Sequence, residues 1–75
     1  MAKPNHILAK FGQNLRKHRE AKGLTQEQLA EKADMDRTYI SDTERGIRNI
    51  GIKNVARLAK TLATTSAKLM EQVDL

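Results

Sequence analysis

The chain has 75 residues, the length of one small domain, and it contains no cysteine, which excludes disulfides and thiolate chemistry. Charged residues make up 31% of the chain, so we expect neither a signal peptide nor a membrane span and place the protein in the cytoplasm. The two histidines, His6 and His18, are too few for an all-histidine metal cage. We therefore expect no metal and no cofactor.

Features of enzymes are also missing from the sequence. The only serines, Ser41 and Ser66, lie outside any nucleophile-elbow pattern, and there is no glycine-rich phosphate loop. We expect a protein that is not an enzyme.

The net charge of +5 is unevenly distributed. Residues 1–22 carry six Lys/Arg against one acid, and residues 37–60 carry six against two, whereas residues 23–36 carry one lysine against four acids. Two basic blocks around an acidic one favour a surface for a polyanion such as nucleic acid. A solvated basic surface explains the charge equally well, so charge alone does not decide.

The spacing of apolar residues predicts an all-α domain of five short helices without strands. The first helix begins after Asn5 as N-cap and ends at Gly23, which suits the left-handed conformation. The second begins at Thr25, where the segment 25–28 has the form of a capping box, and it ends near Ala33. Asp36 caps the third helix, which runs over about residues 37–45.

Two further helices follow the glycine stop at position 46. The fourth begins at about residue 52, and its apolar face comprises Ile52, Val55, Leu58, Ala59 and Leu62. The fifth, capped by Thr65, carries Leu69, Met70 and Val73 and ends near residue 73.

Residues 25–45 have the layout of a helix-turn-helix. Two short, separately capped helices are joined by about four residues, and Asp34 is among the residues that tolerate a positive φ. Leu29, Ala33 and Ile40 lie where the two helices must touch. The second helix of such a unit enters the DNA major groove.

The segment 24–30 (LTQEQLA), followed by Ile40, Glu44, Arg45 and Gly46, resembles the Cro/repressor-type helix-turn-helix family. The segment 36–42 (DRTYISD), with Glu44-Arg45-Gly46 and Arg48-Asn49, is most similar to the controller proteins of restriction–modification systems. The resemblance spans roughly residues 8–70. It implies a lambda-repressor-like fold of five helices, a homodimer and binding to a double-stranded DNA operator.

The resemblance also implies roles for individual residues. The base-reading positions are Arg37, Thr38 and Ser41. The positions that contact the DNA backbone or the minor-groove side are Gln26, Tyr39, Arg45, Arg48 and Asn49. Arg19 and Glu44 match a buried ion pair between the first and third helices. Packing at the edge of the core is an equally good interpretation of Tyr39.

The sequence departs from the family pattern at several positions. Asp34 replaces the usual glycine, which predicts a slightly strained turn. Thr43 replaces a large apolar residue, which predicts thinner packing beneath the third helix. Gly51 leaves the fourth helix with only a glycine N-cap. Ala63, Thr64 and Ser66 replace a glycine and two apolar residues in the last turn.

These observations predict a homodimeric, sequence-specific transcription regulator of a restriction–modification system that acts on its own promoter. Helices over about 52–73, with Leu69, Met70 and Val73, are expected to form the dimer interface. The acidic pair Glu27 and Glu31 is a candidate surface for RNA polymerase. The alternatives are a phage Cro-like repressor, an antitoxin-type regulator, or a protein-interaction module that has lost DNA binding.

Overall fold

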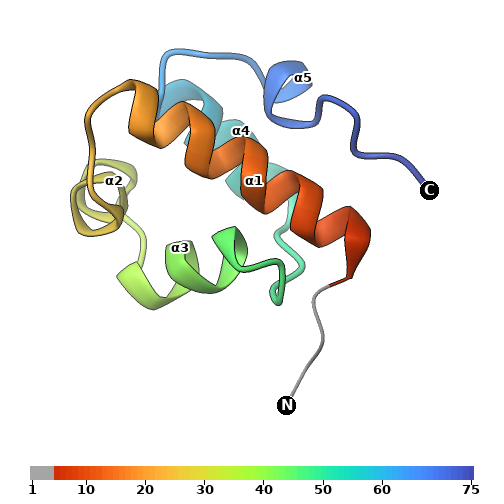
Figure 1. The fold of residues 1–75 in the computed structure, drawn as a ribbon. Helices are drawn as coiled ribbons and strands as arrows, with labels where there is room; N and C mark the ends of the chain where they lie inside the picture. The colour runs from red at the N-terminus through yellow and green to blue at the C-terminus, as the bar shows by residue number, and fades with distance from the viewer. Residues whose placement is uncertain (1–4) are drawn as a thin grey trace.

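The computed structural model describes residues 5–75, and within them the chain is entirely helical apart from turns and loops. The elements are α1 (His6–Ala21), α2 (Gln26–Ala33), α3 (Arg37–Glu44), α4 (Ile52–Thr61) and α5 (Ser66–Leu69). Helix α1 packs against α3 and α5, while α2 packs against α3 and α4. In Figure 1 α1 crosses the front of the molecule, with α3 below it, α4 behind it and α5 above it. The all-α prediction is confirmed.

Each predicted side-chain cap is present at the start of its helix. The side chains of Asn5, Asp36 and Thr65 accept hydrogen bonds from backbone N–H groups in the first turns of α1, α3 and α5. Thr25 and Gln28 form the reciprocal capping box of α2. Gly51 provides no side-chain cap for α4, as the sequence indicated.

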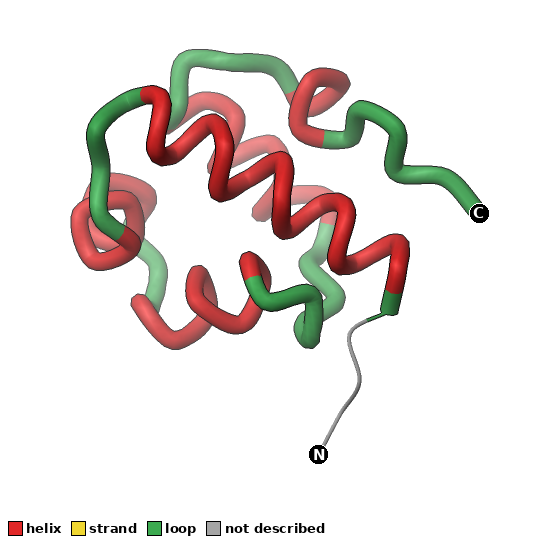
Figure 2. The backbone as a smooth tube through the Cα atoms, viewed as in Figure 1, coloured by secondary structure: helices red, strands yellow, loops and turns green. Residues whose placement is uncertain are grey.

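Left-handed residues follow four of the helices. Gly23, Asp34, Gly46 and Ala63 have φ values of 69°, 55°, 76° and 54°. The predicted positive φ of Asp34 is thus confirmed, and it directs the chain from α2 into α3. Gly46 is required for a second reason, because a Cβ there would lie 2.7 Å from the Cα of Ala9 in α1. Loop residues after α3 can therefore lie close to α1 (Figure 2).

The core lies between the five helices and includes the three residues predicted to join α2 and α3. Its central side chains are fully buried. The residues predicted for the apolar face of the fourth helix are buried in the core, except Ile52, which is 84% exposed. Ile52 was predicted to lie on the apolar face, but it is the first residue of α4. The buried apolar residues are Phe11, Leu15, Leu29, Ala30, Ala33, Ile40, Val55, Leu58, Ala59, Leu62 and Leu69.

Thr43, where the sequence predicted thinner packing, is 1% exposed beneath α3, and its hydroxyl donates a 2.7 Å hydrogen bond to the Tyr39 carbonyl. The prediction that Leu69 contacts a partner was wrong. Leu69 is not a surface residue available to a partner, because it is 0% exposed and belongs to the core.

Helix α5 is also shorter than predicted, since it ends at Leu69. Met70 and Val73 therefore lie in the turns that follow it, where Gln72 has a positive φ. The side chain of Asn14 in α1 holds this segment by donating 2.8 Å hydrogen bonds to the carbonyls of Leu69 and Glu71. In residues 5–75 no helix combines the length and apolar character needed to cross a membrane.

Candidate nucleic-acid interface

The outer face of α3 brings together the three predicted base-reading residues. Arg37 and Thr38 are exposed and Ser41 is half-buried. Residues three and four apart share one face of a helix, so these side chains lie on one side of α3 while Ile40 anchors the other side in the core. The Asp36 carboxylate accepts a 2.7 Å hydrogen bond from the Thr38 amide and fixes the start of the helix.

The predicted buried ion pair attaches α3 to α1. The Arg19 guanidinium approaches the Glu44 carboxylate with two contacts, Nε–Oε2 at 2.6 Å and Nη2–Oε1 at 3.0 Å. The two side chains are 10% and 3% exposed. The third guanidinium nitrogen donates to the Leu24 carbonyl at 2.7 Å, so each charge has partners. The hydrogen bond to Glu44 raises the pKa of Arg19 and outweighs the opposing effect of burial.

Gln26 connects the start of α2 to the same ion pair. Its Nε2 donates a 3.1 Å hydrogen bond to Oε1 of Glu44, and its side chain is half-buried. Gln26 is the first residue of α2, where backbone N–H groups also face outward. An anion bound there would meet both the helix N-terminus and an amide whose direction is fixed.

A second cluster joins α3, the α3–α4 loop and α4. The guanidinium carbon of Arg48 lies 4.4 Å from the centre of the Tyr39 ring, which is cation–π geometry. On α4, Nδ2 of Asn54 donates a 3.0 Å hydrogen bond to the Tyr39 hydroxyl. Tyr39 therefore both packs against its neighbours and keeps part of its surface in solvent.

The other two predicted backbone-contacting residues are exposed and lie after α3. Arg45 caps the C-terminus of α3 and its Nη1 lies 3.6 Å from Oδ1 of Asp42. Asn49 lies in the loop and lines a pocket to which Ile7 and Leu8 of α1 also contribute. Their roles in DNA binding remain predictions.

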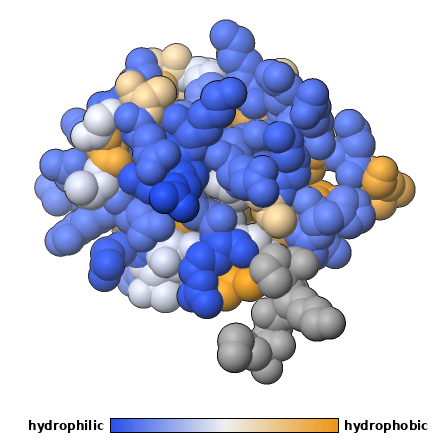
Figure 3. Space-filling model, viewed as in Figure 1, coloured by the Kyte–Doolittle hydropathy of each residue, from blue (hydrophilic) through white to orange (hydrophobic). Residues whose placement is uncertain are grey.

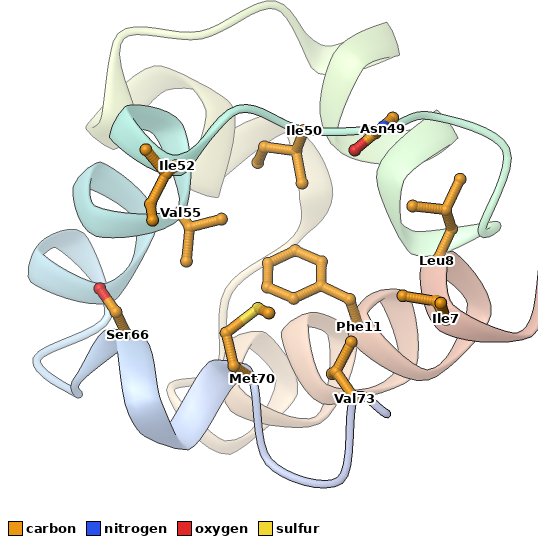
Figure 4. Close-up of a pocket in the computed structure, with 10 residues that line it drawn as sticks. All are labelled: Ile7, Leu8, Phe11, Asn49, Ile50, Ile52, Val55, Ser66, Met70 and Val73. Atoms are coloured by element: carbon orange, nitrogen blue, oxygen red, sulfur yellow. The ribbon is translucent and has the colours of Figure 1, made fainter. Parts of the chain in front are cut away.

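An apolar pocket of about 200 Å³ opens on another part of the surface, between the start of α1, the loop before α4 and the C-terminal turns. Figure 4 shows Phe11, Ile50, Val55 and Met70 around this hollow. Ile52 and Met70 lie on its lining and are 84% and 44% exposed. The face seen in Figure 3 is mostly hydrophilic, and its apolar patches are small and separate.

Comparisons with known proteins agree with this geometry. A helix-turn-helix family model matches residues 15–69. The chain is 41% identical over 68 residues to control protein C.BamHI of Bacillus amyloliquefaciens. This match covers 89% of this chain and 84% of the relative. The chain belongs to the helix-turn-helix family and, within it, to the restriction–modification controller proteins.

Two solved structures extend the similarity to the fold. The controller protein C.AhdI from Aeromonas hydrophila superimposes with a TM-score of 0.84 at 45% identity, over 87% of this chain and 98% of that one. C.Esp1396I, solved as a tetramer in complex with its natural 35 base-pair operator, gives a TM-score of 0.80 at 39% identity, over 92% of this chain and 91% of that one. The predicted family is confirmed.

The sequence of this controller-family chain predicted neither the contact of Asn54 with Tyr39 nor the exposure of Ile52. Asn54 is a polar residue near the start of a helix, and nothing in its local pattern indicates contact with Tyr39, which lies 15 residues away. The side chain of Ile52 matched the apolar spacing of α4, and only its position at the helix end leaves it outside the core.

Proposed function

We propose that this controller-family chain is a homodimeric, sequence-specific DNA-binding transcription regulator that acts on the promoter of its own restriction–modification system. The observation that carries the proposal is the polar row on the outer face of α3, where Arg37 and Thr38 are exposed and Ser41 is half-buried. The buried Arg19–Glu44 pair holds this helix from behind. A rigid helix with a polar outer face is what major-groove recognition requires.

Base reading is assigned to that row. Arg37 projects from the first turn of α3, and its planar guanidinium matches the O6 and N7 acceptors of guanine. Thr38 and Ser41 are shorter and would contact a thymine methyl group or a nearby base edge. This division makes Arg37 the main source of sequence preference.

Backbone contacts are assigned to residues on both sides of the row. Gln26 supports them at the start of α2, and Tyr39 with Arg48 supports them at the other side of α3. Arg45 and Asn49 add exposed groups after α3. Such contacts position a protein on the duplex without reading its sequence, and cationic ones release counterions.

The occupant we propose for the apolar pocket is the same surface of a second copy of this chain. Ile52 and Met70 are exposed apolar side chains in its lining, and Val73 lies beside them. A dimer that binds two half-sites one helical turn of DNA apart must place its two α3 helices about 34–36 Å apart across the two-fold axis. Of the predicted dimer residues, Met70 and Val73 carry this proposal, and Leu69 supports it from within the core.

The proposed protein is a binding protein and not an enzyme, and it acts in the cytoplasm, where promoter DNA is accessible. Activation would need contact with RNA polymerase. Glu27 and Glu31 are exposed on α2 and are four residues apart, so they form one acidic surface for this contact. The double variant Glu27→Lys/Glu31→Lys should reduce transcription from the promoter by purified polymerase without reducing operator affinity.

The test of DNA binding is a gel-shift titration with the DNA upstream of the chain's own gene, against a scrambled duplex of the same length. We expect tighter binding to the upstream DNA, and a logarithm of affinity that falls linearly with the logarithm of salt concentration, by about 0.9 per phosphate contact. Arg48→Ala should weaken binding to both duplexes and reduce that slope. Equal affinity for the two duplexes at every salt concentration would refute sequence-specific regulation.

A further inference from the structure

The hydroxyl of Tyr39 is held in one direction by a residue that has no assigned role. Nδ2 of Asn54 donates to this hydroxyl at 3.0 Å, across the junction of α3 and α4. A tyrosine hydroxyl has one hydrogen to donate, so accepting from Asn54 leaves that hydrogen available. Among the described residues, no hydrogen bond is donated by this hydroxyl.

Arg48 holds the same ring from its face. The guanidinium carbon is 4.4 Å from the ring centre, and Arg48 is exposed, so its N–H groups and its charge remain accessible to an anion. The hydroxyl and the guanidinium belong to one preorganised unit, built from α3, the loop after it and α4. A hydroxyl that accepts one hydrogen bond also donates the next one more strongly.

We infer that Asn54 is a positioning residue for DNA binding: its amide turns the Tyr39 hydroxyl so that the hydroxyl donates to a DNA phosphate. This inference rests on the proposed function. Asn54 does not touch the phosphate itself in this arrangement, and Arg48 supplies the positive charge of the unit. Two carboxylates, Asp34 and Asp36, and the guanidinium of Arg57 line the adjoining hollow with Asn54, but among the described residues neither carboxylate accepts a hydrogen bond from the Tyr39 hydroxyl.

The first experiment is a double-mutant cycle on operator affinity, with the parent, Asn54→Ala, Tyr39→Phe and the double variant. One hydrogen bond is worth about a two- to tenfold change in affinity, so each single variant should weaken binding by about that factor. In the Tyr39→Phe background Asn54→Ala should have almost no further effect. For Asn54→Ala the slope of the logarithm of affinity against the logarithm of salt concentration should match the parent's, since no charge is removed. Arg48→Ala should reduce that slope by about one phosphate contact.

We expect Asn54→Ala to leave the folding of the protein intact. Asn54 is half-buried in the first turn of α4, and alanine is a better helix former, so Asn54→Ala should melt close to the parent temperature. Gln13→Ala, which removes an exposed amide from α1 on the side facing the C-terminal turns, should leave affinity unchanged.

A spectroscopic experiment reports the hydrogen bond directly. The chain has one tyrosine and no tryptophan, so the tyrosine doublet in the Raman spectrum of the protein without DNA arises from Tyr39 alone. Its intensity ratio distinguishes a hydroxyl that accepts from one that only donates. We expect an accepting hydroxyl in the parent and a changed intensity ratio in Asn54→Ala, in which water replaces the amide as the donor.

The outcomes separate this inference from the proposed function. A parent protein that does not bind the upstream DNA overturns the proposed function and, with it, the inference. A parent that binds, together with equal losses from Asn54→Ala in both Tyr39 backgrounds, overturns the inference alone. A parent spectrum in which the hydroxyl only donates overturns it as well.

Discussion

The backbone of α1 at Gly12 lies directly against the carbonyl oxygen of Thr43 in α3. A Cβ at Gly12 would be 2.5 Å from that oxygen, and 2.6 Å from the carbonyl oxygen of Glu44. The neighbouring atoms are backbone, so no flexible side chain can move aside. Glycine at this position sets the distance between the supporting helix and the proposed recognition helix.

Gly12→Ala should therefore destabilise the protein, although alanine normally stabilises a helix interior by about 1 kcal/mol relative to glycine. Displacing α3 by overpacking should give a net loss of about 1–3 kcal/mol. For a domain of this size each kcal/mol lowers Tm by about 4–8 °C. Thermal unfolding followed by circular dichroism measures this, with Gln13→Ala as the neighbouring control. An unchanged Tm for Gly12→Ala would contradict the close approach of α1 and α3.

The signals at helix ends could be predicted because they are local. Thr25 and Gln28 form their capping box within one turn, and Gly23 and Gly46 adopt left-handed conformations at the places where apolar periodicity stops. The family resemblance additionally predicted the pairing of Arg19 with Glu44, across 25 residues. That contact could not have been derived from spacing alone.

Contacts that depend on how distant segments pack could not be predicted. Asn14 binds two carbonyls 55 and 57 residues away, and this fixes the turns that present Met70. Leu69 and Met70 are adjacent apolar residues of the predicted fifth helix, yet Leu69 is in the core and Met70 is 44% exposed. One local pattern is compatible with either arrangement, and only tertiary packing decides between them.

Removing one member of the Arg19–Glu44 pair should be costly. Glu44→Ala leaves a buried guanidinium without its carboxylate and also removes the acceptor of the Gln26 amide, so we expect a loss of about 3–5 kcal/mol. The double variant Arg19→Met/Glu44→Leu should be milder, because no buried charge remains. Denaturant unfolding measures both.

An exposed ion pair on α1 provides the matched control. Arg16 and Glu20 are 3.2 Å apart, with side chains 64% and 55% exposed, so Glu20→Ala should change stability by less than about 1 kcal/mol. The hydrogen bond to the Glu44 carboxylate raises the pKa of Arg19 in the folded state, so as the pH rises from neutral this contribution to stability is lost only at strongly alkaline pH. Equal stability of Glu44→Ala and Glu20→Ala would contradict the buried pair.

Substitutions at the apolar pocket should separate dimerisation from folding. Ile52→Glu and Met70→Glu change side chains that are exposed in the protomer, so each should weaken self-association while the protomer still folds. Leu69→Glu should instead unfold the domain, because it places a charge in the core. Sedimentation equilibrium at micromolar concentration, combined with circular dichroism, distinguishes these effects.

Leu75→Glu is the control for added charge, since Leu75 is fully exposed and does not line the pocket. It should associate like the parent. If Ile52→Glu and Met70→Glu sedimented and bound the operator as the parent does, the second copy would have to use another surface.

Substitution of Arg37 tests base reading most sharply. Arg37 is exposed in the first turn of α3, and a bidentate contact to guanine is worth about 1–3 kcal/mol of discrimination. Arg37→Ala should lose about that free energy on the operator and relax the preference at one guanine per half-site, with little change on scrambled DNA. Arg37→Lys should restore binding only in part, because an ammonium group cannot reproduce the planar fork.

Lys60→Ala removes an exposed cation from α4 and is the charge control, so it should not alter base preference. Binding to operators in which each guanine is replaced in turn measures the effect. If Arg37→Ala weakened operator and scrambled DNA equally, Arg37 would be a phosphate contact, and sequence preference would have to come from Thr38, Ser41 or the shape of the DNA.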